Sequence, residues 1–109
     1  MANDVPGFMA GLPELVILRL LQDREMYGYE IVQAIAARTL QVVAPGEGVV
    51  YPVLHALEKS GALKSRRKMV NGRSRIYYTL TARGAKKLAA LTGHWTAVNH
   101  AIQAVLHAV

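Results

Sequence analysis

The chain has 109 residues, of which 52% are hydrophobic and 18% are charged, and it contains no cysteine. This length and composition fit one globular domain and exclude a disordered chain, a disulfide framework and thiolate chemistry. We expect a cytoplasmic protein, since a reducing compartment suits a chain without cysteine. The formal charge of +6 is divided unevenly: residues 1–58 hold three basic and seven acidic side chains, whereas residues 59–109 hold ten basic and none acidic. Such asymmetry indicates nucleic acid or an anionic membrane surface as a partner.

The N-terminal part of the chain predicts two helices. Pro13 suits the first turn of a helix that runs to about Gln22, because a proline at the first helical position loses no hydrogen bond. Apolar residues at helical spacing give this segment a broad hydrophobic face. After a short break at residues 23–26, a second helix covers about residues 27–38.

A third helix is predicted at residues 47–60. It follows a loop at residues 40–48 that contains one proline and two glycines, and Gly61 is placed to terminate it. A proline is tolerated in the first turn of a helix but not in its interior, so Pro52 leaves the exact first residue of this helix undetermined. Three apolar residues mark the inward side of the helix: Val50, Leu54 and Leu57.

A basic β-hairpin is predicted at Leu63–Leu80, which holds six of the 13 Lys and Arg residues and no acidic residue. Asn71-Gly72 predicts a two-residue turn, since both turn positions need a positive φ that these residues adopt at low cost. This turn places Val70 opposite Arg73 and fixes which residues share a face. One face, expected to pack on a core, holds Leu63, Ser65, Arg67, Met69, Ser74, Ile76, Tyr78 and Leu80. The other face holds five cations: Lys64, Arg66, Lys68, Arg73 and Arg75.

A last helix is predicted at about Ala82–Ala108, with Thr81 as its N-cap. Its apolar residues follow the alternating spacing of three and four that is typical of a coiled-coil seam: Leu88, Leu91, Trp95, Val98, Ile102 and Val105. A helix this apolar does not stand free in water, so we expect it to pair with a second copy across a two-fold axis. The alternative to this pairing is that the last helix packs into the core of its own domain. Its three histidines argue against a membrane-spanning segment.

The order helix, helix, helix, hairpin, helix predicts a winged helix-turn-helix. Its fold class is α+β and mainly α-helical, with a two-stranded β wing and a C-terminal dimerisation helix. We expect residues 1–81 to form the winged helix-turn-helix domain and residues 82–109 to form the dimerisation helix, both within one compact unit. In such domains the second helix of the pair, here residues 47–60, enters the major groove of DNA.

Three segments carry a resemblance to a known family. They are GYEI at residues 28–31, PGEGVVYPVLHALEKSGAL at residues 45–63 and RIYYTLTARG at residues 75–84. In this order and spacing they resemble the signatures of PadR-type transcriptional regulators, and the resemblance covers about residues 12–84. The length of the chain is similar to that of the short subfamily, which has a single C-terminal helix. The resemblance implies a homodimeric DNA-binding repressor of the kind that often responds to a small molecule.

The residues expected to contact double-stranded DNA lie on the third helix and the hairpin. They are Tyr51, His55, Lys59, Lys64, Arg66, Lys68, Arg73 and Arg75. These side chains can donate hydrogen bonds to phosphates, which set position, whereas base contacts set sequence. The third helix lacks Arg, Asn and Gln, the usual readers of G and A, so we expect DNA shape and the wing to carry more of the recognition. The alternative is a packing role for Tyr51 and a solvated basic surface elsewhere, with Arg67 near the tip extending along apolar surface.

The last helix also carries Trp95, the only tryptophan of the chain. In some short members of the resembled family, an aromatic-lined cavity at the dimer interface holds planar apolar compounds. Carried onto this chain, the lining of that cavity is Met9, Leu12, Val16, Trp95, Val98, Asn99 and Ile102. The alternative is that Trp95 fills a closed interface, as is usual for a tryptophan at helical spacing.

No motif for catalysis, metal binding or cofactor binding is present, so we expect neither an enzyme nor a resident cofactor or metal. Three functions fit a basic winged helix. The favoured one is a sequence-specific repressor that binds a palindromic operator as a homodimer and is released by an apolar or aromatic effector. An architectural or RNA-binding winged-helix protein without an effector is the second. A dimeric module whose basic face meets an acidic protein is the third, and it is disfavoured because no acidic residue follows Glu58.

Overall fold

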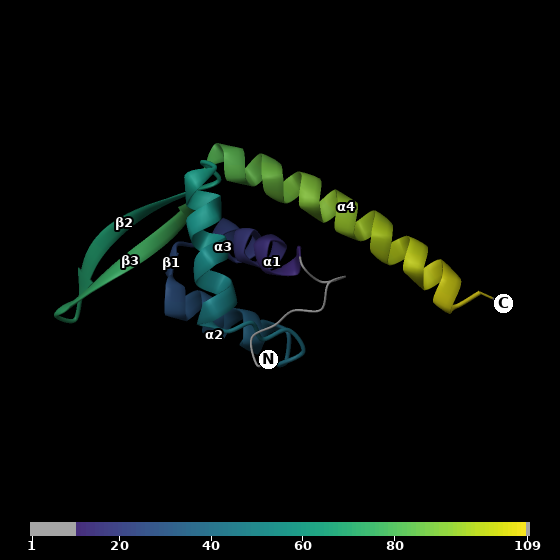
Figure 1. Cartoon of the computed structure of the whole chain (residues 1–109), viewed down its shortest axis with the longest axis horizontal. Coiled ribbons are helices and arrows are strands. Elements are labelled where there is room, and N and C mark those ends of the chain that lie inside the picture. The colour runs from purple at the N-terminus through teal and green to yellow at the C-terminus, as the bar shows by residue number, and fades with distance from the viewer. Residues whose placement is uncertain (1–10, 109) are drawn as a thin grey trace.

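The computed structural model describes residues 11–108. Within that part of the chain, four helices and a three-stranded sheet follow in the order α1 (Leu12–Asp23), β1 (Met26–Tyr27), α2 (Gly28–Arg38), α3 (Glu47–Lys59), β2 (Leu63–Val70), β3 (Arg73–Leu80) and α4 (Ala82–Leu106). Figure 1 shows α1, α2 and α3 packed together, with the β2–β3 hairpin extending from one side and α4 leading away on the other. The hairpin and the far end of α4 are therefore the two projecting parts of the molecule.

The core lies where the first three helices meet the base of the sheet. Its most deeply buried side chains come from α1, α2, α3 and β2: Ile17, Leu18, Ile31, Ile35, Val50, Leu54 and Leu63. The predicted inward side of α3 is confirmed, since its three buried residues are those expected from helical spacing. Burial of this apolar surface is the main force that holds the short helices together, because helices of this length are marginal in isolation.

Helix α3 has the termination that glycine at position 61 predicts. Gly61 has a φ of +86°, the N–H of Ala62 donates to the carbonyl of Leu57 at 2.9 Å, and the N–H of Gly61 donates to the carbonyl of Glu58 at 3.1 Å. This pair of bonds is a Schellman motif, which satisfies the last carbonyls of the helix. Pro52 lies in the second turn, deeper than expected, because the helix begins at Glu47.

The register of the hairpin is confirmed. Val70 is paired with Arg73 and Leu63 with Leu80, and the turn residues Asn71 and Gly72 have φ values of +52° and +77°. Two positive φ values are the mark of the type I′ turn that matches the twist of the flanking strands.

A third strand, β1, departs from the expectation of a break followed by a helix that starts near residue 27. Met26 pairs with Tyr78 and Tyr27 with Tyr77, so the sheet has the order β1-β3-β2, and α2 begins one residue later at Gly28. A strand of two residues is too short to show alternation in sequence, and it exists only because β3 offers it partners. The wing thus grows out of a three-stranded sheet.

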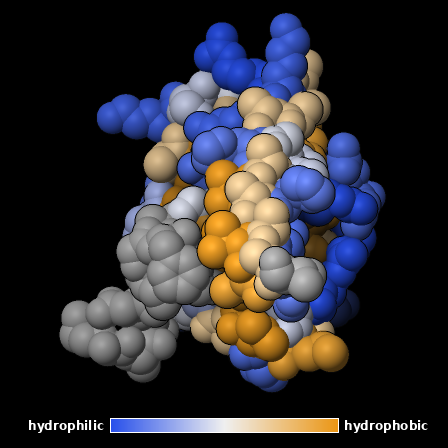
Figure 2. All heavy atoms as spheres, turned by 90° about the vertical axis from the view of Figure 1, so that its right-hand side faces the viewer, coloured by the Kyte–Doolittle hydropathy of each residue, from blue (hydrophilic) through white to orange (hydrophobic). Residues whose placement is uncertain are grey.

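Helix α4 begins at the hairpin and leaves the domain. The N–H of Gly84 donates to the Thr81 hydroxyl at 3.0 Å, which confirms Thr81 as the N-cap. Leu88 is buried and Leu91 is packed against the core, but most side chains beyond Leu91 are exposed. Figure 2 looks onto the end of the molecule toward which α4 extends and shows apolar side chains gathered there. None of the helices within residues 11–108 is both long and apolar enough to cross a membrane.

Candidate nucleic-acid interface

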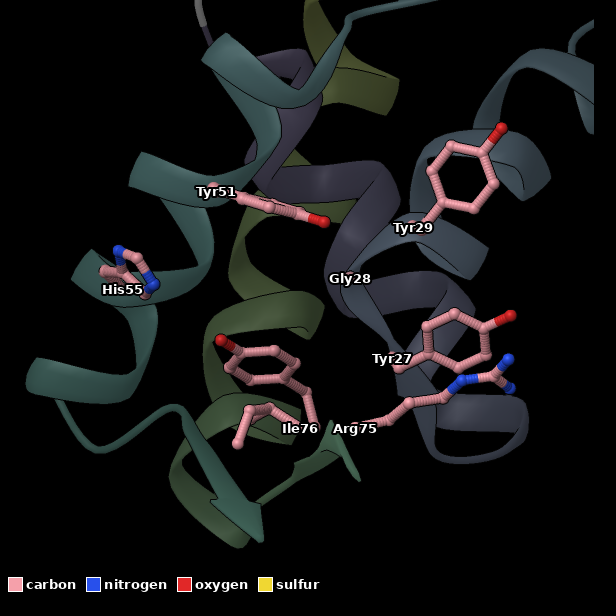
Figure 3. A pocket seen from close by; sticks show the side chains of 8 residues that line it. Tyr27, Gly28, Tyr29, Tyr51, His55, Arg75 and Ile76 are labelled. Carbon is pink, nitrogen blue, oxygen red and sulfur yellow. The ribbon is translucent and has the colours of Figure 1, made fainter. Parts of the chain in front are cut away.

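A cavity of about 320 Å³ lies between α3, the start of α2 and β3 (Figure 3). Its lining is Tyr27, Gly28, Tyr29, Tyr51, His55, Arg75, Ile76 and Tyr78. Four of the five tyrosines of the chain therefore meet here, together with one arginine and one histidine. The lining includes no carboxylate, so this concave surface presents hydrogen-bond donors and aromatic faces to whatever enters it.

Tyr51 occupies the centre of this site. In Figure 3 its ring projects from α3 toward the start of α2, above the side chain of His55. A Cβ atom at position 28 would lie 2.6 Å from Cε1 of Tyr51, so the ring packs against the backbone of Gly28. Burial raises the pKa of the Tyr51 phenol, and the Glu47 carboxylate raises it further. The raised pKa keeps the Tyr51 hydroxyl protonated at neutral pH, so it is a hydrogen-bond donor, and the Glu47 carboxylate is an acceptor beside it.

Arg75 is held at the edge of the cavity by aromatic contacts. Its guanidinium carbon lies 4.4 Å from the centroid of the Tyr27 ring, and the two side chains lie together in Figure 3. The rings of Tyr27 and Tyr77 meet edge to face at 5.5 Å, and the Lys68 ammonium lies 4.3 Å from the Tyr77 centroid. Two cations and two rings thus lie in continuous contact, which orders the middle of the hairpin where β1 joins β3.

The cationic face of the hairpin has an anionic neighbour that the sequence did not indicate. Glu25, in the connection between α1 and β1, accepts hydrogen bonds from Arg66 at 3.3 Å and from Lys68. The hydrogen bond from Lys68 holds the pKa of the Glu25 carboxyl below its usual value. Glu25 directly precedes β1, and the pairing of β1 with β3 brings it beside the hairpin. Its position could therefore not be predicted without the third strand.

The opposite face of the hairpin is buried only at its base. Leu63 and Tyr78 belong to the core, whereas Arg67, Met69 and Ser74 near the tip are exposed, with Met69 70% exposed. The expectation that this whole face packs on the core is therefore wrong for the outer half. The outer half extends past the core, so Arg67 donates to the Ser74 hydroxyl at 2.8 Å instead of packing on apolar surface.

The residues predicted to contact DNA fall into three groups. Tyr51, His55 and Arg75 are brought together around the cavity. Arg66 and Lys68 are engaged by Glu25. The other three are exposed at the surface: Lys59 at the end of α3, Lys64 near the base of β2 and Arg73 beside the turn. Sequence reasoning missed Tyr27 and Tyr29, although the tyrosine of the GYEI segment was a signal that could have found the second of them.

Among the described residues, those predicted to hold an effector are divided between two helices, α1 and α4. Met9 lies outside the described residues. Leu12 and Val16 are half-buried on α1, and Val16 lines a groove of about 190 Å³ whose other lining residues belong to α1, α2 and the residue after α2. On α4, Trp95 is 41% exposed and Ile102 is 50% exposed, with Val98 half-buried and Asn99 exposed. In the part of the chain that the structure covers, no cluster of three or more metal-ligating side chains was found.

The arrangement of α2, α3 and the β1-β3-β2 sheet defines a winged helix-turn-helix. The sequence model of the Transcriptional regulator PadR-like family matches residues 17–90. The chain belongs to this family, which confirms the resemblance noted in its three sequence segments. Family members are transcriptional regulators, and the expectation that this protein is not an enzyme is confirmed on that ground.

Individual relatives agree with this assignment. The chain is 33% identical over 99 residues to the protein named Transcriptional regulator Rv3488 of Mycobacterium tuberculosis, covering 91% of this chain and 87% of the relative. A transcriptional regulator from Clostridium thermocellum has a similar structure, with a TM-score of 0.82, 29% identity and coverage of 88% of this chain and 94% of its own. A PadR-like transcriptional regulator from Bacillus cereus has a TM-score of 0.81, 26% identity and coverage of 94% and 98%.

Proposed function

We propose that this transcriptional regulator is a repressor that binds a palindromic operator as a homodimer. Helix α3 enters the major groove and the β2–β3 hairpin follows the adjacent backbone. The observation that carries the proposal is the cavity between α3 and β3, whose lining holds phenols, an imidazole and a guanidinium, with the Glu47 carboxylate beside Tyr51 but outside the lining. Such a surface is suited to the sugar–phosphate backbone, where most protein–DNA hydrogen bonds are made.

Contacts to DNA divide into positioning and reading. Tyr51 and Arg75 at the cavity and Arg73 at the tip position the protein on phosphates. Because α3 contains no Arg, Asn or Gln, few side chains are available for bidentate contacts to base edges. His55 is the exposed side chain of α3 best placed to reach a base beside the cavity. Sequence-dependent groove shape then supplies the rest of the discrimination.

The test of this function is the salt dependence of binding to duplex DNA. Fluorescence anisotropy with a labelled fragment from upstream of the protein's own gene should show log K falling linearly with log salt, with a slope of about −0.9 for each phosphate neutralised. A random-sequence duplex of the same length should bind more weakly. Affinity that is flat between about 50 and 200 mM salt would contradict the proposal. Equal affinity for both fragments would instead favour an architectural protein.

A pair of charge-matched variants localises the binding surface. Arg73→Gln removes an exposed cation beside the hairpin turn and should make the salt slope shallower by about 1 per protomer. Lys86→Gln removes the same charge from an exposed position on α4 and should leave the slope unchanged. An equal loss in both variants would show that net charge, and not the hairpin, determines affinity.

We further propose that a planar apolar compound relieves repression by binding between the α4 helices of the dimer. The exposed ring of Trp95 on an apolar helix supports this assignment. A bound compound would change the distance between the two α3 helices, which must be about 34–36 Å, one turn of DNA, in the binding form. Titration with planar aromatic compounds should quench the Trp95 fluorescence, and the same compounds should weaken binding to the operator. A broad panel without either response would remove this part of the proposal.

A further inference from the structure

Glu25 lies where a DNA phosphate is otherwise expected, against the cationic face of the hairpin. One carboxylate oxygen lies 3.3 Å from Nη2 of Arg66, and the other contacts Nζ of Lys68. These two cations belong to the face that also carries Lys64, Arg73 and Arg75. A carboxylate offers two acceptor oxygens to two donors, as a phosphate does, so Glu25 satisfies the same hydrogen-bonding groups that a nucleic acid would use.

The contact of Glu25 with Arg66 is solvent-accessible, whereas its contact with Lys68 is partly buried. The side chain of Glu25 is 25% exposed and that of Arg66 is 66% exposed, so their attraction is screened by water and salt. The hairpin does not depend on them for its position, because the β1-β3-β2 pairing and the contact between Tyr27 and Tyr77 hold it as far as its middle. Arg66 and Lys68 can therefore leave Glu25 without unfolding the wing.

We propose that Glu25 is a built-in competitor of DNA, which holds Arg66 and Lys68 in the free protein and lowers the affinity of the hairpin for phosphate. The inference rests on the proposed DNA-binding function. With Glu25 ionised, the three side chains carry a net charge of +1, and without it they carry +2. The carboxylate thus removes about one phosphate contact from each hairpin. Glu25 therefore weakens the charge-dependent binding of the hairpin to phosphates. Contacts made by α3 then supply a larger share of the total affinity for DNA.

The experiment is Glu25→Gln, measured by anisotropy on the upstream duplex and on a random-sequence duplex across a salt series. The variant should bind both duplexes more tightly, with a salt slope steeper by about 0.9 per protomer. The relative gain should be larger on the random duplex, where phosphate contacts dominate. In an Arg66→Gln/Lys68→Gln background, Glu25→Gln should change neither affinity nor slope, since the cations it would release are absent.

The control is Glu14→Gln, which makes the same chemical change at another half-exposed carboxylate. Glu14 is paired with Lys87 at 2.8 Å between α1 and α4, away from the hairpin, so its replacement should leave the salt slope as it was. If the wild type binds DNA and Glu25→Gln binds it equally or more weakly, the proposed role of Glu25 is overturned, while the DNA-binding function stands. A wild type that binds neither duplex would overturn the proposed function and this inference together. Thermal unfolding of each variant should match that of the wild type, which checks that the wing and core remain folded.

Discussion

Gly28 at the cavity and Gly84 at the start of α4 have different neighbours, and this difference separates a functional position from a structural one. A Cβ at position 84 would lie 2.1 Å from the backbone oxygen of Ala62, which cannot move without distorting the junction of the hairpin and α4. A Cβ at position 28 would instead meet the ring of Tyr51, a partly exposed side chain that lines the cavity. The same substitution is therefore expected to have opposite consequences at the two positions.

Gly28→Ala should weaken DNA binding with little loss of stability. The added methyl group displaces the Tyr51 ring from the cavity, while Gly28 is the first residue of α2 and its φ is not in the positive region that disfavours alanine. We expect the free energy of unfolding to change by less than about 1 kcal/mol. Gly84→Ala should lower it by about 1–3 kcal/mol through overpacking. Urea unfolding measures the stability of both variants, and anisotropy on the same preparations measures their affinity for DNA. Normal DNA affinity in Gly28→Ala would show that the position of the Tyr51 ring is irrelevant to binding.

At the scale of elements, the sequence predicted what local chemistry determines. The turn at Asn71-Gly72, the terminator at Gly61 and the N-cap at Thr81 each depend on neighbouring residues alone, and all three are confirmed. Strand β1 was not predictable, because two residues take extended form only when β3 pairs with them. Missing β1 hid the contact of Glu25 with the hairpin, and it hid Tyr27 as part of the cavity.

The same distinction explains the faces of the hairpin. Alternation along the strands correctly grouped the side chains, since it follows from the register that the turn fixes. It did not indicate how far along the hairpin the core extends. That limit is set by the position of α1 and α3, which cover Leu63 and Tyr78 but leave Met69 in solvent. Of the candidate residues on the hairpin, Arg75 therefore lines the cavity, whereas Lys64 near the base and Arg73 beside the turn are exposed.

At the scale of the whole molecule, the outer part of α4 is an apolar helix that the other elements within residues 11–108 leave largely uncovered. Beyond Leu91 it extends from the domain with Trp95, Ile102, Val105 and Leu106 exposed, and Figure 1 shows its far end clear of the other elements. Exposed apolar residues of this kind on a projecting helix indicate an interface. Because Val98 and Ile102 continue the seam that starts at Leu88, a second copy of the same helix is the partner whose pattern matches.

The dimer prediction is tested by placing a charge on the seam. Ile102→Glu should convert the protein to a monomer in sedimentation velocity experiments, because an ionised carboxylate in the interface would lose its hydration without a partner. His100→Glu introduces the same side chain on the opposite side of α4, at an exposed position, and should remain dimeric. The monomer should keep its helical circular dichroism and lose affinity for a palindromic duplex far more than for a half-site, since only the dimer spans both halves. A dimer of Ile102→Glu as stable as the wild type would place the interface elsewhere, and the effector site between the α4 helices would have to be abandoned with it.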